Sequence, residues 1–455
     1  MKVGGDITVR GFIRRCVDLN CIDDEKSVAN NTVAAGDRND RFLMQTTGIN
    51  IGADLTENVS TFVRLANESD WARDAATGGG ATGTLSDFAV SQSYVTLKEL
   101  FYSPLTVKVG RQPISWGRGF VLGSNLIPSI VNRTNDLHGS ITANEFTDFT
   151  AFDAIRATLD LSNMGGLNIP LLADYVYIKL NEGSVGRSDD VTLQGVNFST
   201  HLDNHNAEAE TYWLIKRDRS TKNLTDTGGA TTTPATDNFG SVNTIGVRGS
   251  AKPVEGGYVF GEIAYQFGRR ALDGDAALIA GDAHQAWAWD LGVEYTLQNT
   301  AWNPKLGWEW IFWSGKDIDG AGNGWDPIAR GYYTTALREF QTGANAGFYP
   351  TPQAGDTSAA TNQHQFAWYG SINPIEDLTI APRLTFFFLD ESSTVAKPGK
   401  RRGYAGAEWD TNVVYNYTDD VQFGLLYALF APGNIYRGLN DASSQELVTT
   451  VSVKF

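Results

Sequence analysis

Apolar and polar residues alternate along most of this chain, in segments of roughly 10 to 14 residues. In the segment 286–297, AWAWDLGVEYTL, one face carries Trp287, Trp289, Leu291, Val293, Tyr295 and Leu297. The segments 304–313, PKLGWEWIFW, and 377–388, DLTIAPRLTFFF, repeat the pattern. The alternation is blurred in 168–181 and 190–201. Because side chains of a strand point alternately to its two faces, the pattern predicts β-strands with one apolar face.

The connections between these segments alternate between short and long. Short ones read LTENV, FYSPL, NMGGL, LDNHN, KPVEGG, LQNTAW, NPIED and YTDDV. Long polar ones lie around 16–40, 71–86, 115–148, 182–189, 218–240, 269–282, 315–360, 391–402 and 433–442. A soluble β-sandwich gives no reason for this regularity, whereas an outer-membrane barrel has short periplasmic turns and long extracellular loops. We predict an all-β, antiparallel transmembrane β-barrel of about 18 strands, with residues 1–455 forming one domain.

Composition agrees with a strand-built membrane protein. The 455 residues include 12 Trp, 17 Tyr and 48 Gly, and aromatic residues gather where a membrane meets water. Mean hydropathy is -0.25, and no stretch approaches the roughly 18 apolar residues of a transmembrane helix. This excludes a helical membrane protein. The net charge of -16, from 36 basic and 52 acidic residues, argues against nucleic acid as a partner.

The same alternation predicts which charged side chains face the lumen. The predicted inward bases are Arg10, Arg14, Arg64, Lys98, Lys108, Arg156, Lys216, Arg248, Lys305, Arg383 and Lys454. The predicted inward acids are Glu208, Glu210, Glu262, Asp290, Glu294, Glu309, Glu408 and Asp410. Bases dominate the early strands and acids the later ones, so that closure places two walls of opposite charge across the pore. These walls either select charged or sugar-like solutes or only solvate the lumen.

Three stretches resemble the alginate-export type of outer-membrane porin. Residues 105–125, LTVKVGRQPISWGRGFVLGSN, are similar to its GRQ strand and following loop, and 149–161, FTAFDAIRATLDL, to its FDG-hydrophobic-R strand. Residues 310–331, WIFWSGKDIDGAGNGWDPIARG, resemble its SGD…FDP segment, from which Lys316 departs. The resemblance implies an 18-stranded channel, which in some members exports an acidic polysaccharide.

Two further patterns concern a disulfide and a metal. Cys16 and Cys21, in CVDLNC, predict a disulfide closing a small loop, with two free thiols as the alternative. Asp317, Asp319 and Asp326 lie among glycines in DIDGAGNGWD, a spacing that lets oxygen ligands converge on calcium in an extracellular loop. The segment lacks the distal Glu of an EF-hand, and a plain Gly/Asp turn is the alternative. No other cofactor is expected.

The function predicted from these features is passive transport. Five His are present, and none lies in a nucleophile, metal or haem motif, so we expect no enzyme. We expect a porin of a Gram-negative-type outer membrane, in contact with lipid and lipopolysaccharide, that passes hydrophilic anionic or saccharide solutes. Loops 115–148 and 315–360 are expected to fold inward. The alternatives are a dedicated exporter of acidic exopolysaccharide with periplasmic partners, and a plugged structural or adhesive barrel.

Overall fold

The structure, a computed structural model, describes residues 1–16, 19, 41–71, 88–101, 104–124, 143–162, 169–182, 190–202, 206–219, 240–269, 283–315, 324–339, 361–393, 402–436 and 442–455. Eighteen strands form one antiparallel sheet. They are β1 (Lys2–Arg15), β2 (Arg41–Asp54), β3 (Val59–Asp70), β4 (Ala89–Leu97), β5 (Leu105–Gln112), β6 (Phe152–Asp160), β7 (Leu171–Asn181), β8 (Val191–Leu202), β9 (Ala207–Asp218), β10 (Gly240–Ala251), β11 (Gly257–Arg269), β12 (His284–Thr296), β13 (Lys305–Trp313), β14 (Gln363–Ile375), β15 (Leu378–Ser393), β16 (Arg402–Asn416), β17 (Val421–Pro432) and β18 (Ser444–Lys454).

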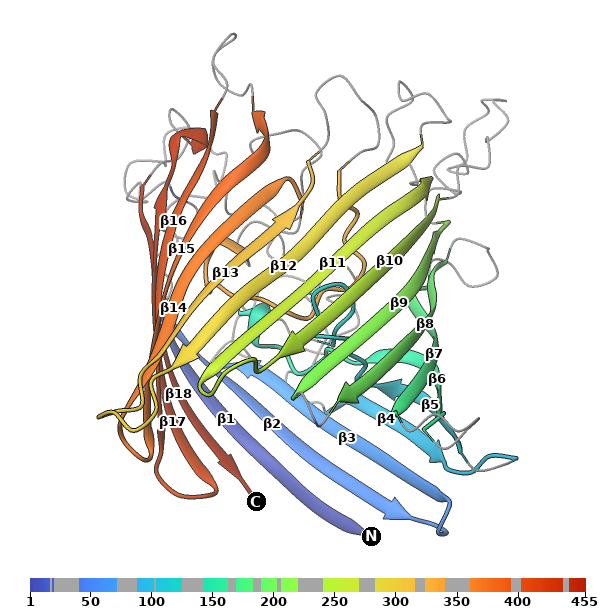
Figure 1. Cartoon of the computed structure of the whole chain (residues 1–455). Coiled ribbons are helices and arrows are strands. Elements are labelled where there is room, and N and C mark those ends of the chain that lie inside the picture. The colour runs from blue at the N-terminus through green and yellow to red at the C-terminus, as the bar shows by residue number, and fades with distance from the viewer. Residues whose placement is uncertain are drawn as a thin grey trace, which may run out of the picture.

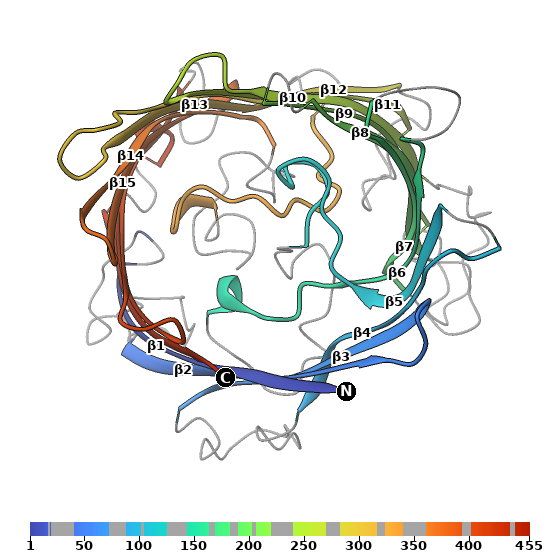
Figure 2. The same ribbon diagram turned by 60° about the horizontal axis from the view of Figure 1, so that its bottom comes forward.

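The sheet closes because β1 pairs with both β2 and β18. The closing register runs from Asp6 opposite Lys454 to Arg15 opposite Gln445. Figures 1 and 2 show the resulting ring of tilted strands. Closure leaves no unpaired strand edge, as lipid requires. The predicted barrel and its strand number are confirmed. Within the described residues, helices are too short and too polar to cross a membrane.

The two ends of the barrel differ as the sequence predicts. Short turns, such as the one between Asp54 and Val59, lie at the end that also holds both chain termini. The strand ends that flank long connections, such as the end of β13 and the start of β14, lie at the other end. In outer-membrane barrels the short turns are periplasmic, which orients the molecule.

The outer face of the strands carries the apolar residues. On β12, Trp287 is 49 % exposed while its neighbours Ala286 and Ala288 are at most 1 % exposed. On β9 and β10, Trp213 and Ile245 lie opposite each other and both face outward. Large exposed apolar side chains on a closed barrel form the surface that lipid covers.

Three described stretches of the long connections lie inside the ring (Figure 2). We call them the first (113–124), second (143–150) and third (324–339) inner segments. The first follows β5, the second contains the short 3-10 helix η4 (Asn144–Phe146) and precedes β6, and the third lies between β13 and β14. The expected infolding is therefore confirmed for the described parts of both loops.

The inner segments pack on the wall through an apolar cluster. Ile114, Trp116 and Phe120 of the first segment and Trp325 and Ile328 of the third are at most 3 % exposed. They share one buried cluster with lumen-facing residues of β7, β8, β9 and β13, among them Val176, Ile178, Leu180, Leu193, Leu214 and Ile311. The barrel thus has apolar residues on both faces where the inner segments are seated.

Candidate pore lining and constriction

The first and third inner segments lie against each other in the lumen. The amide of Gly123 donates to the Ala329 carbonyl over 2.7 Å, and the amide of Gly331 donates to the Gly119 carbonyl over 2.8 Å. Leu122 and Ala329 form a parallel β-bridge. Two connections that are far apart in sequence thereby form one body inside the barrel.

Two glycines permit this close approach. A Cβ on Gly331 would lie 2.6 Å from both the Cα and the carbonyl carbon of Gly123. That separation is far inside van der Waals contact, and the atoms it meets are backbone rather than a flexible side-chain end. The contact between the segments therefore requires residues without a side chain at this point.

Arg118 connects the first segment to acidic residues of the wall. Its guanidinium donates to the Glu309 carboxylate at 3.2 Å and lies 3.7 Å from an Asp290 oxygen. It also lies over the Phe260 ring, 3.7 Å from the centroid, and over the Tyr332 ring at 4.5 Å. Tyr332 of the third segment donates its hydroxyl to the same Glu309 at 2.8 Å. A base from the loops thus neutralises the acidic wall of β12 and β13.

Further wall residues hold the backbone of the inner segments. Glu210 accepts a hydrogen bond from the Gly117 amide at 2.8 Å. Glu408 accepts from the amides of Leu337 and Arg338, at 2.6 and 2.8 Å. Lys216 forms an ion pair with Asp326 at 2.9 Å. The contacts of Glu210 and Glu408 satisfy backbone amides that would otherwise be buried without partners, and the Lys216–Asp326 pair adds a side-chain link to the wall.

The second segment is seated against β1 to β3. Arg14 is buried and forms ion pairs with Glu145 of the segment and with Glu446 of β18. Arg64 binds Asp148 of the segment, with Nε at 2.8 Å, and also Asp6 of β1 at 2.7 Å. Both arginines therefore link the loop to the wall rather than pointing bare charge into the pore.

Most of the predicted lumen bases have an acidic partner. Besides Arg14, Arg64 and Lys216, the pairs are Arg156 with Asp174, Arg248 with Glu208 and Glu210, Lys305 with Glu294, and Arg383 with Glu309. Among the remaining predicted acids, Glu262 accepts from the Tyr212 hydroxyl at 2.7 Å, and Asp410 lies beside the cavity described below. Arg10, Lys98, Lys108 and Lys454 form no ion pair with any described residue. Local pairing leaves less bare charge on the walls than the sequence alone suggests.

Several residues of this network were missing from the predicted lining. Asp6, Asp174 and Glu446 lie on inward positions of their strands, so the alternation carried the signal for them. Arg118, Tyr332, Arg330 and Glu339 belong to inner segments, where no periodicity shows which way a side chain points. Arg118 does lie in the stretch that resembles the GRQ loop of porins.

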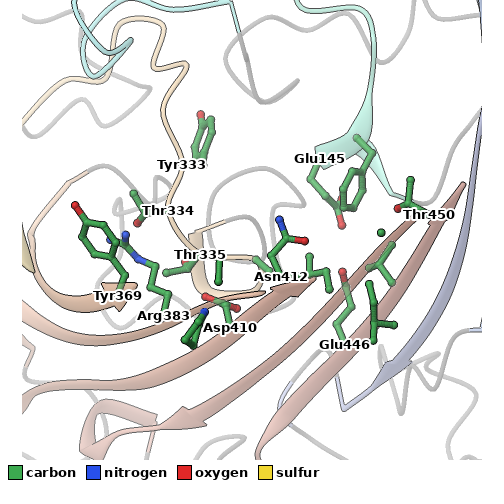
Figure 3. A pocket seen from close by; sticks show the side chains of 18 of the residues that line it. Glu145, Tyr333, Thr334, Thr335, Tyr369, Arg383, Asp410, Asn412, Glu446 and Thr450 are labelled. Atoms are coloured by element: carbon green, nitrogen blue, oxygen red, sulfur yellow. The ribbon is translucent and has the colours of Figure 1, made fainter. Parts of the chain in front are cut away.

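A cavity of about 720 Å³ remains between the inner segments and the wall formed by β13 to β18 and β1. Its lining includes the bases Arg10, Lys305 and Arg383 and the acids Glu145, Asp410 and Glu446. Hydroxyl groups of Tyr333, Tyr369, Thr334, Thr335 and Thr450 lie among them (Figure 3). The cavity therefore offers charged groups of both signs together with many hydroxyls.

The predicted disulfide and calcium site fall partly outside the described residues. Cys16 is disulfide-bonded, whereas Cys21 lies outside them. Asp317 and Asp319 also lie outside, and Asp326 is the ion-pair partner of Lys216. Among the described residues no group of His, Cys, Asp and Glu is arranged to hold a metal. The calcium site stays a prediction.

Comparison with protein families decides the relationship that the motifs suggest. The profile of the family described as Alginate export matches residues 26–450. The chain belongs to the alginate export family. No curated protein matches it. Membership, together with the porin-type barrel, confirms a porin-like channel of the outer membrane.

Solved structures show the same fold at low sequence identity. The chain is similar to OccK10 of Pseudomonas aeruginosa, with a TM-score of 0.53 and 9 % identity, over 100 % of this chain and 99 % of that one. It is also similar to OccAB2 of Acinetobacter baumannii, with a TM-score of 0.52 and 11 % identity, over 100 % of this chain and 98 % of that one. OccK2 of P. aeruginosa, solved in complex with glucuronate, has a TM-score of 0.52 and 10 % identity, over 100 % of this chain and 98 % of that one.

The GRQ stretch, residues 110–112, has a structural role in this barrel. Gly110 has a φ of +122°, a conformation that side chains disfavour. Gln112 is fully buried and donates to the Ala154 carbonyl of β6 at 3.0 Å. Arg111 pairs with Asp153 of β6 at 2.8 Å. The motif thus fixes β5 to β6 at the point where the first inner segment leaves the wall.

Proposed function

We propose that this channel passes carboxylated saccharides, of the uronate class, by passive diffusion past its inner segments. The observation that carries the proposal is the 720 Å³ cavity beside those segments. A volume of that size accommodates a small organic solute. The proposal gives the chain no catalytic step.

The lining of the cavity matches the chemistry of such a solute. Arginine and lysine bind carboxylates through charge-assisted hydrogen bonds, and hydroxyl side chains both donate to and accept from sugar hydroxyls. Arg10 is the lining base that lacks an ion pair among the described residues. Its guanidinium lies over the Phe146 ring, 4.8 Å from the centroid, which holds it beside the cavity.

Two other functions remain as rivals, each with an observation behind it. Family membership favours a dedicated exporter of an acidic polysaccharide, which would engage periplasmic partners. The inner segments, packed on the wall by apolar residues, favour a plugged barrel with a structural role. Lipopolysaccharide as a neighbour follows from the outer-membrane location and is part of the proposal.

Flux into proteoliposomes separates these functions. We expect a uronate disaccharide to enter faster than a neutral disaccharide of the same length. Arg10→Gln should slow the uronate several-fold and leave the neutral sugar unchanged, because only the carboxylate loses a charged partner, whereas Arg10→Lys should keep most of the uronate flux. The absence of flux for both sugars would favour the plugged barrel. Equal rates that do not respond to Arg10→Gln would contradict the uronate proposal.

A further inference from the structure

Lysines without ion pairs gather in a second cavity, at the periplasmic mouth. The cavity has a volume of about 590 Å³ and is lined by residues of β1 to β6. Lys2, Lys98 and Lys108 line it and form no ion pair within the described part of the chain. Its fourth base is Arg156, and Asp54 is the acidic residue of the lining. The position of Asp54 and Lys98 beside short turns places the cavity at the periplasmic end.

The lack of partners here contrasts with the rest of the lumen. Seven of the predicted lumen bases have carboxylate partners, whereas Lys98 and Lys108 do not. Three unpaired lysines that share a cavity with Asp54 as the acidic residue of its lining repel one another and keep its potential positive. An anion that enters the cavity relieves this repulsion. The arrangement is therefore suited to binding an anion from solution.

The uncharged part of the lining indicates what kind of anion fits. The Lys108 amine lies 4.5 Å from the centroid of the Tyr94 ring, and Tyr94 packs against Phe62 with centroids 5.4 Å apart. Hydroxyls of Ser60, Thr96, Thr106 and Thr158 complete the wall. Amines suit a carboxylate, hydroxyls suit sugar hydroxyls, and an aromatic pair suits the apolar face of a sugar ring.

The adjoining side of the same mouth, next to β1 across the β1–β18 pairing, has the reverse charge. A cavity of about 380 Å³ is lined there by Asp377, Asp419 and Asp420 from two short turns, with Lys454 as its base. The field between the two sides directs an anion toward β1 to β6 and away from β15 to β18. Clefts of one charge raise the local concentration and the association rate of an opposite charge by about 10- to 1000-fold.

We infer that the cavity of Lys2, Lys98 and Lys108 is a docking site where a carboxylated saccharide first binds on the periplasmic side. The inference rests on the proposed function and adds a site to it: the cavity speeds the association of a solute that arrives from the periplasm, whereas the direction of net flux follows the concentration gradient. From the docking site the solute would pass to the larger cavity beside the inner segments.

The test uses single channels of known orientation in a planar bilayer. A uronate trisaccharide is added to one chamber at a time, and the rate of current-blocking events gives its association rate. We expect faster association from the periplasmic chamber. In the double variant Lys98→Gln/Lys108→Gln, that rate should fall about tenfold, while association from the extracellular chamber stays unchanged.

Controls keep the outcomes distinct. Neither lysine has a carboxylate partner, so the variant leaves no orphaned acid, and the unchanged extracellular rate reports an intact barrel. Lys252→Gln removes an exposed charge between β10 and β11, outside the cavity, and should alter neither rate. An unchanged periplasmic rate in the double variant, or an equal fall from both sides, would overturn the docking site. A lack of blocking events from either side in the unmodified protein would overturn the proposed function itself.

Discussion

The guanidinium of Arg118 donates to the carboxylate of Glu309 over 3.2 Å, although Arg118 lies on the first inner segment and Glu309 on β13. The second oxygen of Glu309 accepts from Arg383 of β15. Asp290 is fully buried beside Glu309, and Arg118 is its ion-pair partner among the described residues, so removing Arg118 leaves a buried carboxylate without its cation. The position of the inner segment therefore depends on this pair.

Replacing Arg118 by Gln should release the first inner segment. Asp290 would lose the cation beside it, while Glu309 keeps Arg383, so we expect a cost of about 3 kcal/mol in the docking of the segment, at the low end for a broken buried pair. We expect larger and noisier single-channel currents and a lower melting midpoint in the heat-dependent gel shift. Lys252→Gln is the control, because Lys252 lies exposed between β10 and β11 and forms no ion pair with a described residue. If the currents of Arg118→Gln are as small and as quiet as those of the wild type, the ion pair does not hold the segment in place.

Gly331→Ala should separate the first inner segment from the third. The added methyl group would meet Gly123 backbone atoms at 2.6 Å, and such overpacking costs about 1–3 kcal/mol. We expect altered gating with an unchanged β-type circular dichroism spectrum, since the strands are not touched. Gly403→Ala adds the same group where nothing lies within 4 Å and should behave as wild type. If the two variants behave alike, the contact between the segments does not control the pore.

Acid should loosen the third inner segment through Glu339. Burial acts to raise the pKa of this carboxyl, but Arg330 and hydrogen bonds from Gln365 and the Thr334 amide lower it more, so that the pKa lies below its ordinary value of 4.5. A depressed pKa means that the carboxylate stabilises the docked segment above pH 4.5, and that this contribution is lost as the pH falls through the folded-state pKa.

Single-channel conductance measured from neutral to acidic pH checks this. We expect the conductance of the wild-type channel to change below pH 4.5. The conductance of Glu339→Gln at neutral pH should already equal that of the wild-type channel in acid. A transition centred near neutral pH, or one that survives in Glu339→Gln, would assign the acid response to another group.

The strands could be predicted from sequence because lipid imposes one rule on every outward position. Trp287, Trp289 and Leu291 face lipid wherever the loops lie, so period-2 alternation survives. The alternation is blurred at 168–181 because Val176, Ile178 and Leu180 point inward and are buried under the first inner segment. An apolar inner face hides the period, and sequence alone does not show that a loop covers it.

The lining was harder to predict than the strands, for a related reason. The alternation predicts Arg64 and Arg156 on the inner face, but it could not show that Asp148 of a loop and Asp174 of β7 bind them. Whether a lumen base is bare or paired depends on neighbours across the sheet and on infolded loops. Arg118 illustrates the limit most clearly, because its acidic partners come from β12 and β13.

Arg64→Gln combined with Arg156→Gln should lower the preference of the pore for anions. The change removes two positive charges and leaves Asp6, Asp148 and Asp174 without these partners. We expect the reversal potential in a potassium chloride gradient to shift toward the equilibrium potential of potassium. Arg111→Gln, whose charge lies outside the lumen, should not shift it. An unchanged potential in the double variant would mean that these arginines only solvate the wall.

The reversal potential of the unmodified channel in a gradient of potassium glucuronate tests the central claim most directly. The chain carries a net charge of -16, so an unselective or surface-dominated pore would favour potassium. Our account predicts measurable conductance and a reversal potential whose sign shows that glucuronate permeates faster than potassium, because the bases of the two cavities lie along the path. A reversal potential of the opposite sign, which would mean that potassium permeates faster, or no conductance at all, would contradict a channel for carboxylated saccharides.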